Sequence, residues 1–207
     1  MRESLRNIAR ANRWFGGAHA VRWAVTQLVR DAPAGASLIL LDVGAGAGDL
    51  ARAAESVARA RGVKLDVLCL DRHRVAASLA KAAGYASLVS DAGALPLADQ
   101  SVDILLLSQL VHHFDRPSAE RLLRESARVA RRGIIVSDLQ PSWIAAALFR
   151  PAARALGFDR ITIHDGLTSL RRAYSRTELA GLMQRAGLPA RVMRRPGWRL
   201  VGLATLS

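Results

Sequence analysis

The fold is decided by the stretch Leu38-Ile39-Leu40-Leu41-Asp42-Val43-Gly44-Ala45-Gly46-Ala47-Gly48-Asp49-Leu50. Its apolar first half predicts a buried strand, and the three alternate glycines predict a turn into a helix that begins near Asp49. Glycine accepts positive φ in such a turn, and its missing side chain lets a ligand lie against the backbone amides. We therefore expect Gly44, Gly46 and Gly48 to form the floor of a nucleotide-type cofactor site.

Acidic residues follow the predicted strands and indicate the charge of that cofactor. Asp42 ends the first strand, and Asp71 and Asp91 follow the second and third. A pyrophosphate on the glycine turn would gain nothing from a carboxylate there, whereas a cationic ligand would. S-adenosylmethionine carries a sulfonium, an ammonium and no phosphate, so the pattern favours it over NAD.

Length and composition limit the fold and the location. The chain has 207 residues, which suits a single domain, and no apolar run approaches the roughly 18 residues of a membrane span. The basic segment 1–13 has no apolar core after it and does not resemble a secretory signal. Cys69 is the one cysteine, so we expect neither a disulfide framework nor a metal cluster, and a cytoplasmic location.

The formal net charge of +13 raises nucleic acid as a partner. Lys64 and Lys81 are the only lysines, and the arginines are dispersed along predicted helices, as at Arg121, Arg124 and Arg128. Such spacing is typical of a solvated helix face. We therefore favour a solvated surface over a nucleic-acid partner, and RNA stays as the alternative substrate.

The segments after the glycine turn alternate between strand and helix. This alternation predicts parallel strands with right-handed crossovers, whose carboxyl ends meet at one edge of the sheet. Strands are predicted over 38–43, 65–70, 87–90, 102–108 and 133–139, and helices over 49–61, 72–83 and 117–130.

The two ends of the chain depart from this alternation. Residues 1–36 predict a helical cover, with two helices within 3–30 and a hinge at Gly16-Gly17. Trp14 and Phe15 either line a substrate pocket or pack this cover onto the sheet.

The segment 141–174 reads as an insertion between the fifth strand and the last helix. It predicts an apolar helix over 142–156, broken at Pro151, and then a loop that holds His164-Asp165-Gly166. A capping box at Ser175-Arg176-Thr177-Glu178 begins a last helix, which ends near Ala186. Residues 190–194 and 198–206 predict a hairpin.

The sequence Asp-Val-Gly-Ala-Gly-Ala-Gly at 42–48 resembles the first motif of class I S-adenosylmethionine-dependent methyltransferases. The likeness covers about residues 38–140, and the stretch Leu95 to Phe114 is also similar to the family pattern. Within the family, the chain is similar to the small-molecule branch that includes ubiquinone- and menaquinone-biosynthesis and polyketide-tailoring enzymes. The resemblance implies that the segment 141–174 sets substrate specificity. The resemblance implies a Rossmann-like α/β fold: a mostly parallel seven-stranded sheet, helices on both faces and an antiparallel C-terminal hairpin.

The resemblance also implies the cofactor contacts. Asp71 falls beside the glycine turn, where its carboxylate suits the two ribose hydroxyls; capping the helix 72–83 is a compatible role. Asp91 resembles the residue that binds the adenine amine, and Ala92 would offer its backbone amide. The predicted set for S-adenosyl-L-methionine, with S-adenosyl-L-homocysteine as product, is Asp42, Gly44, Gly46, Gly48, Asp71, Arg72, Asp91, Ala92 and Ser108.

Histidine is the natural general base for a hydroxyl acceptor. The predicted catalytic residues are His113, after the fourth strand, and the pair His164 and Asp165 in the insertion; each histidine has a structural alternative. The arginines near residue 171 either hold an acidic acceptor or face water. The predicted substrate contacts are Trp14, Phe15, His112, Trp143, Arg171 and Tyr174.

The predicted function is methyl transfer from S-adenosylmethionine to a small aromatic or lipid-like acceptor, on oxygen, by in-line displacement. Ser108-Gln109-Leu110 stands where an Asn-Pro-Pro-Tyr motif would follow the fourth strand, which argues against amino-group methylation of DNA, glutamine or adenine. A non-catalytic cofactor-binding module, or an NAD-binding oxidoreductase domain, are the alternatives outside this class. A homodimer is compatible with the sequence, and an integral membrane segment is not expected.

Overall fold

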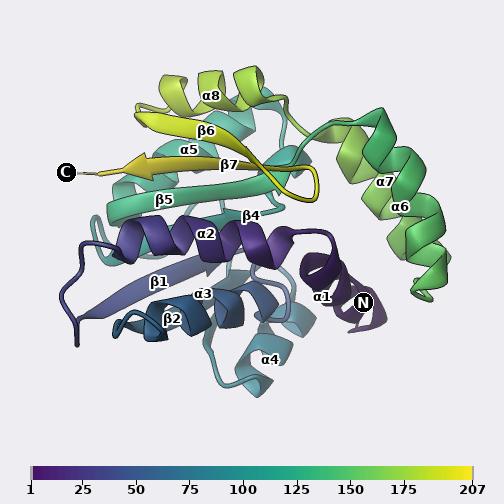
Figure 1. The fold of residues 1–207 in the computed structure, drawn as a ribbon. Coiled ribbons are helices and arrows are strands. Elements are labelled where there is room, and N and C mark those ends of the chain that lie inside the picture. Colours follow the sequence, from purple (N-terminus) through teal and green to yellow (C-terminus); the bar gives the residue numbers. More distant parts are fainter. Residues whose placement is uncertain (1, 207) are drawn as a thin grey trace.

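Seven strands form one mixed sheet in the computed structural model, which describes residues 2–206 (Figure 1). Their spatial order is β3-β2-β1-β4-β5-β7-β6, and β7 runs antiparallel to both of its neighbours. The predicted fold class is confirmed, including the C-terminal hairpin. The strands are β1 (Ser37–Val43), β2 (Lys64–Asp71), β3 (Ala86–Val89), β4 (Val102–Ser108), β5 (Ala130–Leu139), β6 (Ala190–Arg195) and β7 (Arg199–Thr205).

Helices cover both faces of the sheet (Figure 1). Apolar side chains of α2, α3 and α4 pack on one face, and those of α5 and α8 on the other. Every residue of β4 is buried, because this central strand has helices on both sides. The helices are α1 (Arg2–Trp14), α2 (Gly17–Val29), α3 (Asp49–Arg59), α4 (Arg74–Ala82), α5 (Arg116–Val129), α6 (Trp143–Ala155), α7 (Arg160–Arg172) and α8 (Arg176–Arg185), with a 3-10 turn η1 (Val111–His113).

The strand register brings four carboxyl ends to one edge. Val43 of β1 pairs with Leu70 of β2 and Leu107 of β4, and Ser108 pairs with Ser137 of β5. β1 lies between β2 and β4, so the chain reverses its direction of travel across the sheet there. Ligands of open α/β sheets bind at such a switch point.

Helices α1, α6 and α7 gather beyond this edge, on the right of Figure 1. The hinge between α1 and α2 is confirmed: Gly16 has φ of 81°, and a Cβ there would meet the Pro196 carbonyl of the β6–β7 turn. Asn7 of α1 donates to Asp159, the N-cap of α7, at 2.8 Å. The first helix is therefore held at its middle and just beyond its C-terminal end.

Two local predictions in the insertion are wrong. α6 continues through Pro151, because this residue lies on the exposed side of the helix, where water can bond the freed carbonyl. The predicted loop around Gly166 is part of α7, whose N-terminus is capped when Asp159 accepts the amide of Thr162. Glycine at position 166 is typical of a loop, but here it lies within a helix. A Cβ on Gly166 would overlap the Phe149 ring, so the missing side chain permits the close approach of α6 and α7.

The ends of the remaining elements follow the predictions closely. The capping box of Ser175 and Glu178 is confirmed at the start of α8. The N-cap of α4 is His73, not Asp71, because Asp71 is the last residue of β2. No helix within residues 2–206 is both long and apolar enough to cross a membrane.

Candidate active site

A cavity of about 770 Å³ lies over the carboxyl edge of the sheet. Its floor is made by the glycine turn and the ends of β2, β4 and β5, and its roof by α1, α6 and α7. The predicted cofactor residues line this cavity, with the exception of Gly48, which lies beneath the turn against Tyr85. The distant segments that the topology brings together therefore enclose one site.

The glycine turn has the conformation that its sequence predicts. Gly44, Gly46 and Gly48 have φ of 74°, 57° and 77°, in the left-handed region that favours glycine. A Cβ on Gly44 would lie 3.1 Å from the Leu110 side chain, and one on Gly46 would enter the space below Leu5. Because glycine has no side chain, a ligand in the cavity can lie directly against the backbone of the turn at Gly44 and Gly46.

Asp42 is buried at the cavity floor without a cation. Its side chain is 1% exposed, and Oδ2 has no hydrogen-bond partner. Burial, followed by the charges of Asp49 and Asp71, raises the pKa of Asp42 to about 8. A buried carboxyl in this state gains most from a positively charged ligand. The donor set therefore fits the ammonium and sulfonium groups of S-adenosylmethionine and does not fit a pyrophosphate.

Asn12 and Asp49 connect the roof of the cavity to the glycine turn. Neither residue is among the site residues predicted from the sequence. Asn12 Nδ2 donates to Asp49 Oδ2 at 2.9 Å, and the Asn12 side-chain oxygen accepts from Gln109. Burial raises the pKa of Asp49, and its bond from Asn12 opposes that shift. Asp49 could have been found as the first carboxylate after the glycines, whereas no local signal marks Asn12.

Asp71 shapes the neighbouring wall. Its carboxylate accepts the amide of Gly46 at 3.1 Å and that of His73 at 2.8 Å. These bonds orient the carboxylate between the glycine turn and the start of α4. Arg72, which follows it, is exposed at the cavity wall, and Ser108 is buried at the end of β4.

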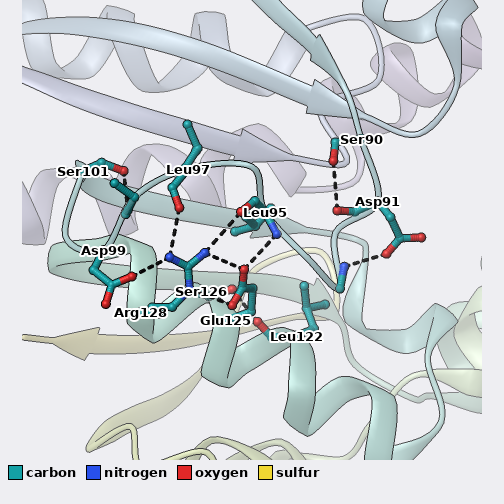
Figure 2. A network of polar contacts seen from close by, with 12 residues as sticks. Ser90, Asp91, Leu95, Leu97, Asp99, Ser101, Leu122, Glu125, Ser126 and Arg128 are labelled. Atoms are coloured by element: carbon teal, nitrogen blue, oxygen red, sulfur yellow. Dashed lines mark hydrogen bonds and ion pairs between the residues drawn. The ribbon is translucent and has the colours of Figure 1, made fainter.

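Asp91 and Ala92 begin the loop that closes the opposite wall, and Figure 2 shows how that loop is held. Asp91 Oδ1 accepts the amide of Gly93 at 2.7 Å. Further along, Arg128 of α5 bonds the Leu97 carbonyl at 2.9 Å and the Asp99 carboxylate at 2.6 Å, while its neighbour Glu125 accepts the amide of Leu95 at 2.8 Å. The loop is thus fastened to α5 from both its backbone and its side chains.

His112 and Asp138 form a buried pair that was predicted only in part. His112 Nδ1 lies 2.6 Å from Asp138 Oδ1, and the two residues are each 4% exposed. Asp138 also accepts the amides of His112 and Leu139. The nearby His112 and these bonds outweigh burial and lower the pKa of Asp138, so its carboxylate accepts the Nδ1 proton. His112 Nε2 is buried, has no partner and belongs to the cavity lining.

The other predicted catalytic residues have different environments. His113 lines the cavity from an exposed position, with its ring centroid 4.2 Å from that of His112. Loss of water contact and the charge of His112 lower the pKa of His113. His164 is exposed on α7 and does not line the cavity, whereas Asp165 does. Adjacent residues of a helix face different directions, so the expected pairing of His164 with Asp165 is not formed.

The predicted substrate contacts divide in the same way. Phe15 and His112 line the cavity, and the Phe15 ring meets that of Phe149 edge-on at 5.5 Å. Trp14 and Trp143, 64% and 81% exposed, lie outside the lining. Arg171 also lies outside the cavity lining, although the next residue, Arg172, is part of it. Tyr174 is outside the lining as well, because it packs against the core and donates to the Phe114 carbonyl.

Arg199 is a lining residue that no sequence signal indicated. It begins β7, is 2% exposed, and donates from Nε to the Phe15 carbonyl at 2.9 Å. Its Nη1 is buried without a partner, and burial lowers the pKa of Arg199 to about 10. In the sequence it is one arginine among many, in a hairpin rather than in a motif.

The fold and the site have the features expected of a class I S-adenosylmethionine-dependent methyltransferase. Residues 41–137 match the family model described as "Methyltransferase domain", which spans the chain from β1 to β5. The family uses S-adenosylmethionine, so the predicted cofactor is confirmed. No curated protein matches the chain in sequence.

Solved structures share the fold at low sequence identity. A methyltransferase from Aquifex aeolicus is 20% identical with a TM-score of 0.61, over 88% of this chain and 89% of its own. Magnesium protoporphyrin IX methyltransferase from Synechocystis, solved with bound S-adenosylmethionine, is 17% identical with a TM-score of 0.62, over 93% and 80%. The pyocyanin biosynthetic protein PhzM is 20% identical with a TM-score of 0.56, over 89% of this chain and 54% of PhzM.

Proposed function

We propose that the protein methylates a hydroxyl group of a small aromatic or lipid-like acceptor. The observation that carries this proposal is His112, a lining residue whose Nδ1 bonds Asp138 and whose Nε2 has no partner within residues 2–206. A neutral imidazole whose Nδ1 proton is held by a carboxylate presents a lone pair at Nε2. A buried base of this kind suits an acceptor whose proton must be removed during transfer.

In this proposal the residues divide into a donor end and an acceptor end. The donor end consists of the glycine turn with Asp42, Asp49, Asp71, Asp91 and Ala92; Arg72 and Ser108 complete its walls. S-adenosylmethionine, when bound there, supplies an electrophilic methyl group that departs from a neutral thioether. The acceptor end consists of His112, Asp138, Phe15, Phe149 and Arg199.

The acceptor end performs proton transfer and exclusion of water. Nε2 of His112 takes the hydroxyl proton, and Asp138 stabilises the resulting imidazolium through Nδ1. The roof of α1, α6 and α7 excludes water and aligns the acceptor, which a methyl transfer with a good leaving group chiefly requires. His113, beside His112, contributes to the wall, and Asp165 to the roof. One domain, with segments 1–36 and 141–174 as its cover, accounts for these roles.

Phe15 and Phe149 support the aromatic or apolar character of the acceptor. Their rings meet in the roof, and the surrounding cluster includes Phe158 and Ile163. Small-molecule methyltransferases also occur among the structures that share this fold, including the porphyrin enzyme and the pyocyanin biosynthetic protein. An enclosed cavity of this size suits a small molecule better than a folded RNA.

The test is a His112→Asn variant. We expect kcat with phenolic acceptors and labelled S-adenosylmethionine to fall about 100- to 10,000-fold, because a general base contributes that much. Affinity for S-adenosylhomocysteine should stay within about twofold, since His112 belongs to the acceptor end. His113→Asn is the matched control and should retain most activity.

Three results would redirect the proposal. Equal loss in the His113→Asn variant would move the base to His113. Unchanged turnover in His112→Asn would remove the base altogether. Methylation of RNA but of no small phenol, quinol or polyketide would favour the nucleic-acid alternative, and cofactor binding without any methyl transfer would favour a non-catalytic module.

A further inference from the structure

We propose that Arg199 binds a carboxylate of the acceptor, so that the substrate class is an aromatic hydroxy acid. The inference deepens the proposed function and rests on it for the identity of the hydroxyl group. It rests independently on the buried guanidinium, its free Nη1 and the aromatic side chains beside it.

Arg199 lacks the partner that a buried guanidinium normally has. Within residues 2–206, no carboxylate oxygen lies within 4 Å of it, and its one described hydrogen bond leads from Nε to the Phe15 carbonyl. The nearest influential anion, Asp138, is committed to His112 and two backbone amides. Arginine keeps its proton at neutral pH, so this cavity-lining guanidinium is charged, and the Asp138 charge acts on it without a direct bond.

The geometry of the free atoms suits a carboxylate. Nε is already used, and Nη1 is buried without a partner among residues 2–206, in a residue that lines the cavity. Guanidinium groups bind planar anions with directed, charge-assisted hydrogen bonds. The backbone bond to Phe15 fixes the guanidinium plane, so little freedom is lost when an anion binds.

The surroundings describe the rest of the acceptor. The residue whose carbonyl Arg199 holds is Phe15, and the Phe15 ring contacts Phe149 of α6. An aromatic body packed against these two rings would carry its carboxylate to Arg199. His112 lies in η1, which follows β4, and β4 is nearer than β7 to the donor end in the sheet order. A hydroxyl on the same body would meet Nε2 there.

The carboxylate of S-adenosylmethionine itself is the other anion that Arg199 could bind. In the sheet, β4 and β5 separate β7 from β1, which places three strand spacings, or about 14 Å, between Arg199 and the glycine turn. The donor end instead gathers four carboxylates around its ligand. This separation favours the acceptor as the anion that Arg199 binds.

The experiment measures binding rather than turnover. Protein saturated with S-adenosylhomocysteine is titrated calorimetrically with 4-hydroxybenzoate, 6-hydroxy-2-naphthoate and the corresponding carboxamides. We expect each acid that binds to do so at least about tenfold more tightly than its amide, because a charge-assisted bond to the buried arginine is lost in the amide. Arg199→Gln should remove this preference by weakening the acid alone.

Two variants accompany Arg199→Gln. Arg194→Gln is the matched control, since Arg194 is exposed on β6 and lies outside the cavity lining; it should keep the full preference. Arg199→Lys keeps the charge without the planar fork and should give an intermediate preference, which also covers the case in which Arg199→Gln does not fold.

The inference is overturned if the unsubstituted protein binds acid and amide equally, or binds neither. It is also overturned if Arg199→Gln weakens both by the same factor, or weakens S-adenosylhomocysteine in step with the acid. A protein that binds the acids without methylating them contradicts the proposed function alone. One that methylates neutral phenols and ignores acids contradicts this inference alone.

Discussion

The donor end and the acceptor end of the cavity are built in opposite ways. The donor end is built around one contiguous turn, with further carboxylates at the end of β2 and after β3, and within residues 2–206 no cation pairs with the buried Asp42. The acceptor end is assembled from η1, β5, β7, α6 and the residue after α1, and among the same residues no carboxylate bonds the buried Arg199. Each end thus holds a group whose charged form a ligand of the opposite sign would stabilise. This contrast in charge favours binding of a cationic donor at one end of the cavity and of an anionic acceptor at the other.

The largest expected effect on this contrast comes from Asp42→Asn. Loss of the buried anion should weaken S-adenosylmethionine about 100-fold by calorimetry, because a charge-assisted contact in a desolvated site is lost. The acid preference at Arg199 should be unaffected. If affinity falls by less than about threefold, the donor end does not depend on its charge.

The same variant has a predictable effect on stability. Burial raises the pKa of Asp42 from 3.8 to about 8, so between these values the folded protein binds more protons than the unfolded chain. The free energy of unfolding therefore falls as pH rises from about 4 to 8, and Asn removes this dependence. Asp42→Asn should accordingly be more stable than the unsubstituted, ligand-free protein at pH 9, by roughly 3 to 5 kcal/mol, in urea unfolding. Equal free energies of unfolding for Asp42→Asn and the unsubstituted protein at pH 9 would show that burial does not raise the pKa of Asp42.

Binding should show the complementary pH dependence. A cation at the donor end favours the ionised form of Asp42, so S-adenosylmethionine affinity should rise between pH 6 and pH 8, by up to about tenfold per pH unit. In Asp42→Asn this rise should disappear. A rise that persists in the variant would assign the titration to another group.

The next effect in size is expected from Asp71→Ala. It removes the acceptor of the Gly46 and His73 amides and the proposed ribose contact, and should weaken S-adenosylhomocysteine about tenfold. Asp66→Ala, on an exposed part of the same strand, is the matched control and should bind normally. Unchanged affinity in Asp71→Ala would argue against the ribose placement.

The two ends also differ in how far the sequence predicts them. The glycine turn, Asp42 and Asp71 follow from local patterns, because a strand, a turn and a helix adjacent in sequence fix their own geometry. His112 was identified as a lining residue, but its partner Asp138 lies at the end of another strand. Arg199 and Asn12 carry no local pattern at all, because they act only through contacts across the fold.

The errors in the insertion have the same origin. Pro151 and Gly166 are helix breakers in isolation, and the sequence reading placed a break and a loop there. In the structure, an exposed side of α6 tolerates the proline, and contact with Phe149 requires the glycine. Consequently His164 and Asp165, expected together in a loop, lie on a helix and face different directions. Tertiary packing decided the conformation that local propensity left open.

The smallest effect is expected from Asn12→Ala, which tests whether the two ends are independent. Asn12 ties α1 to Asp49 and to Gln109, and Phe15, which directly follows α1, lies at the boundary with the acceptor end. We expect a three- to fivefold loss of S-adenosylhomocysteine affinity, because one neutral donor to a partly buried carboxylate is removed. Asn7→Ala is the matched comparison, since Asn7 ties the same helix to Asp159 of α7 instead. It should weaken the hydroxy-acid probes and spare S-adenosylhomocysteine. If Asn12→Ala and Asn7→Ala weaken both ligands equally, α1 acts as one rigid cover. The donor end and the acceptor end would then differ in charge but would not be held in place independently.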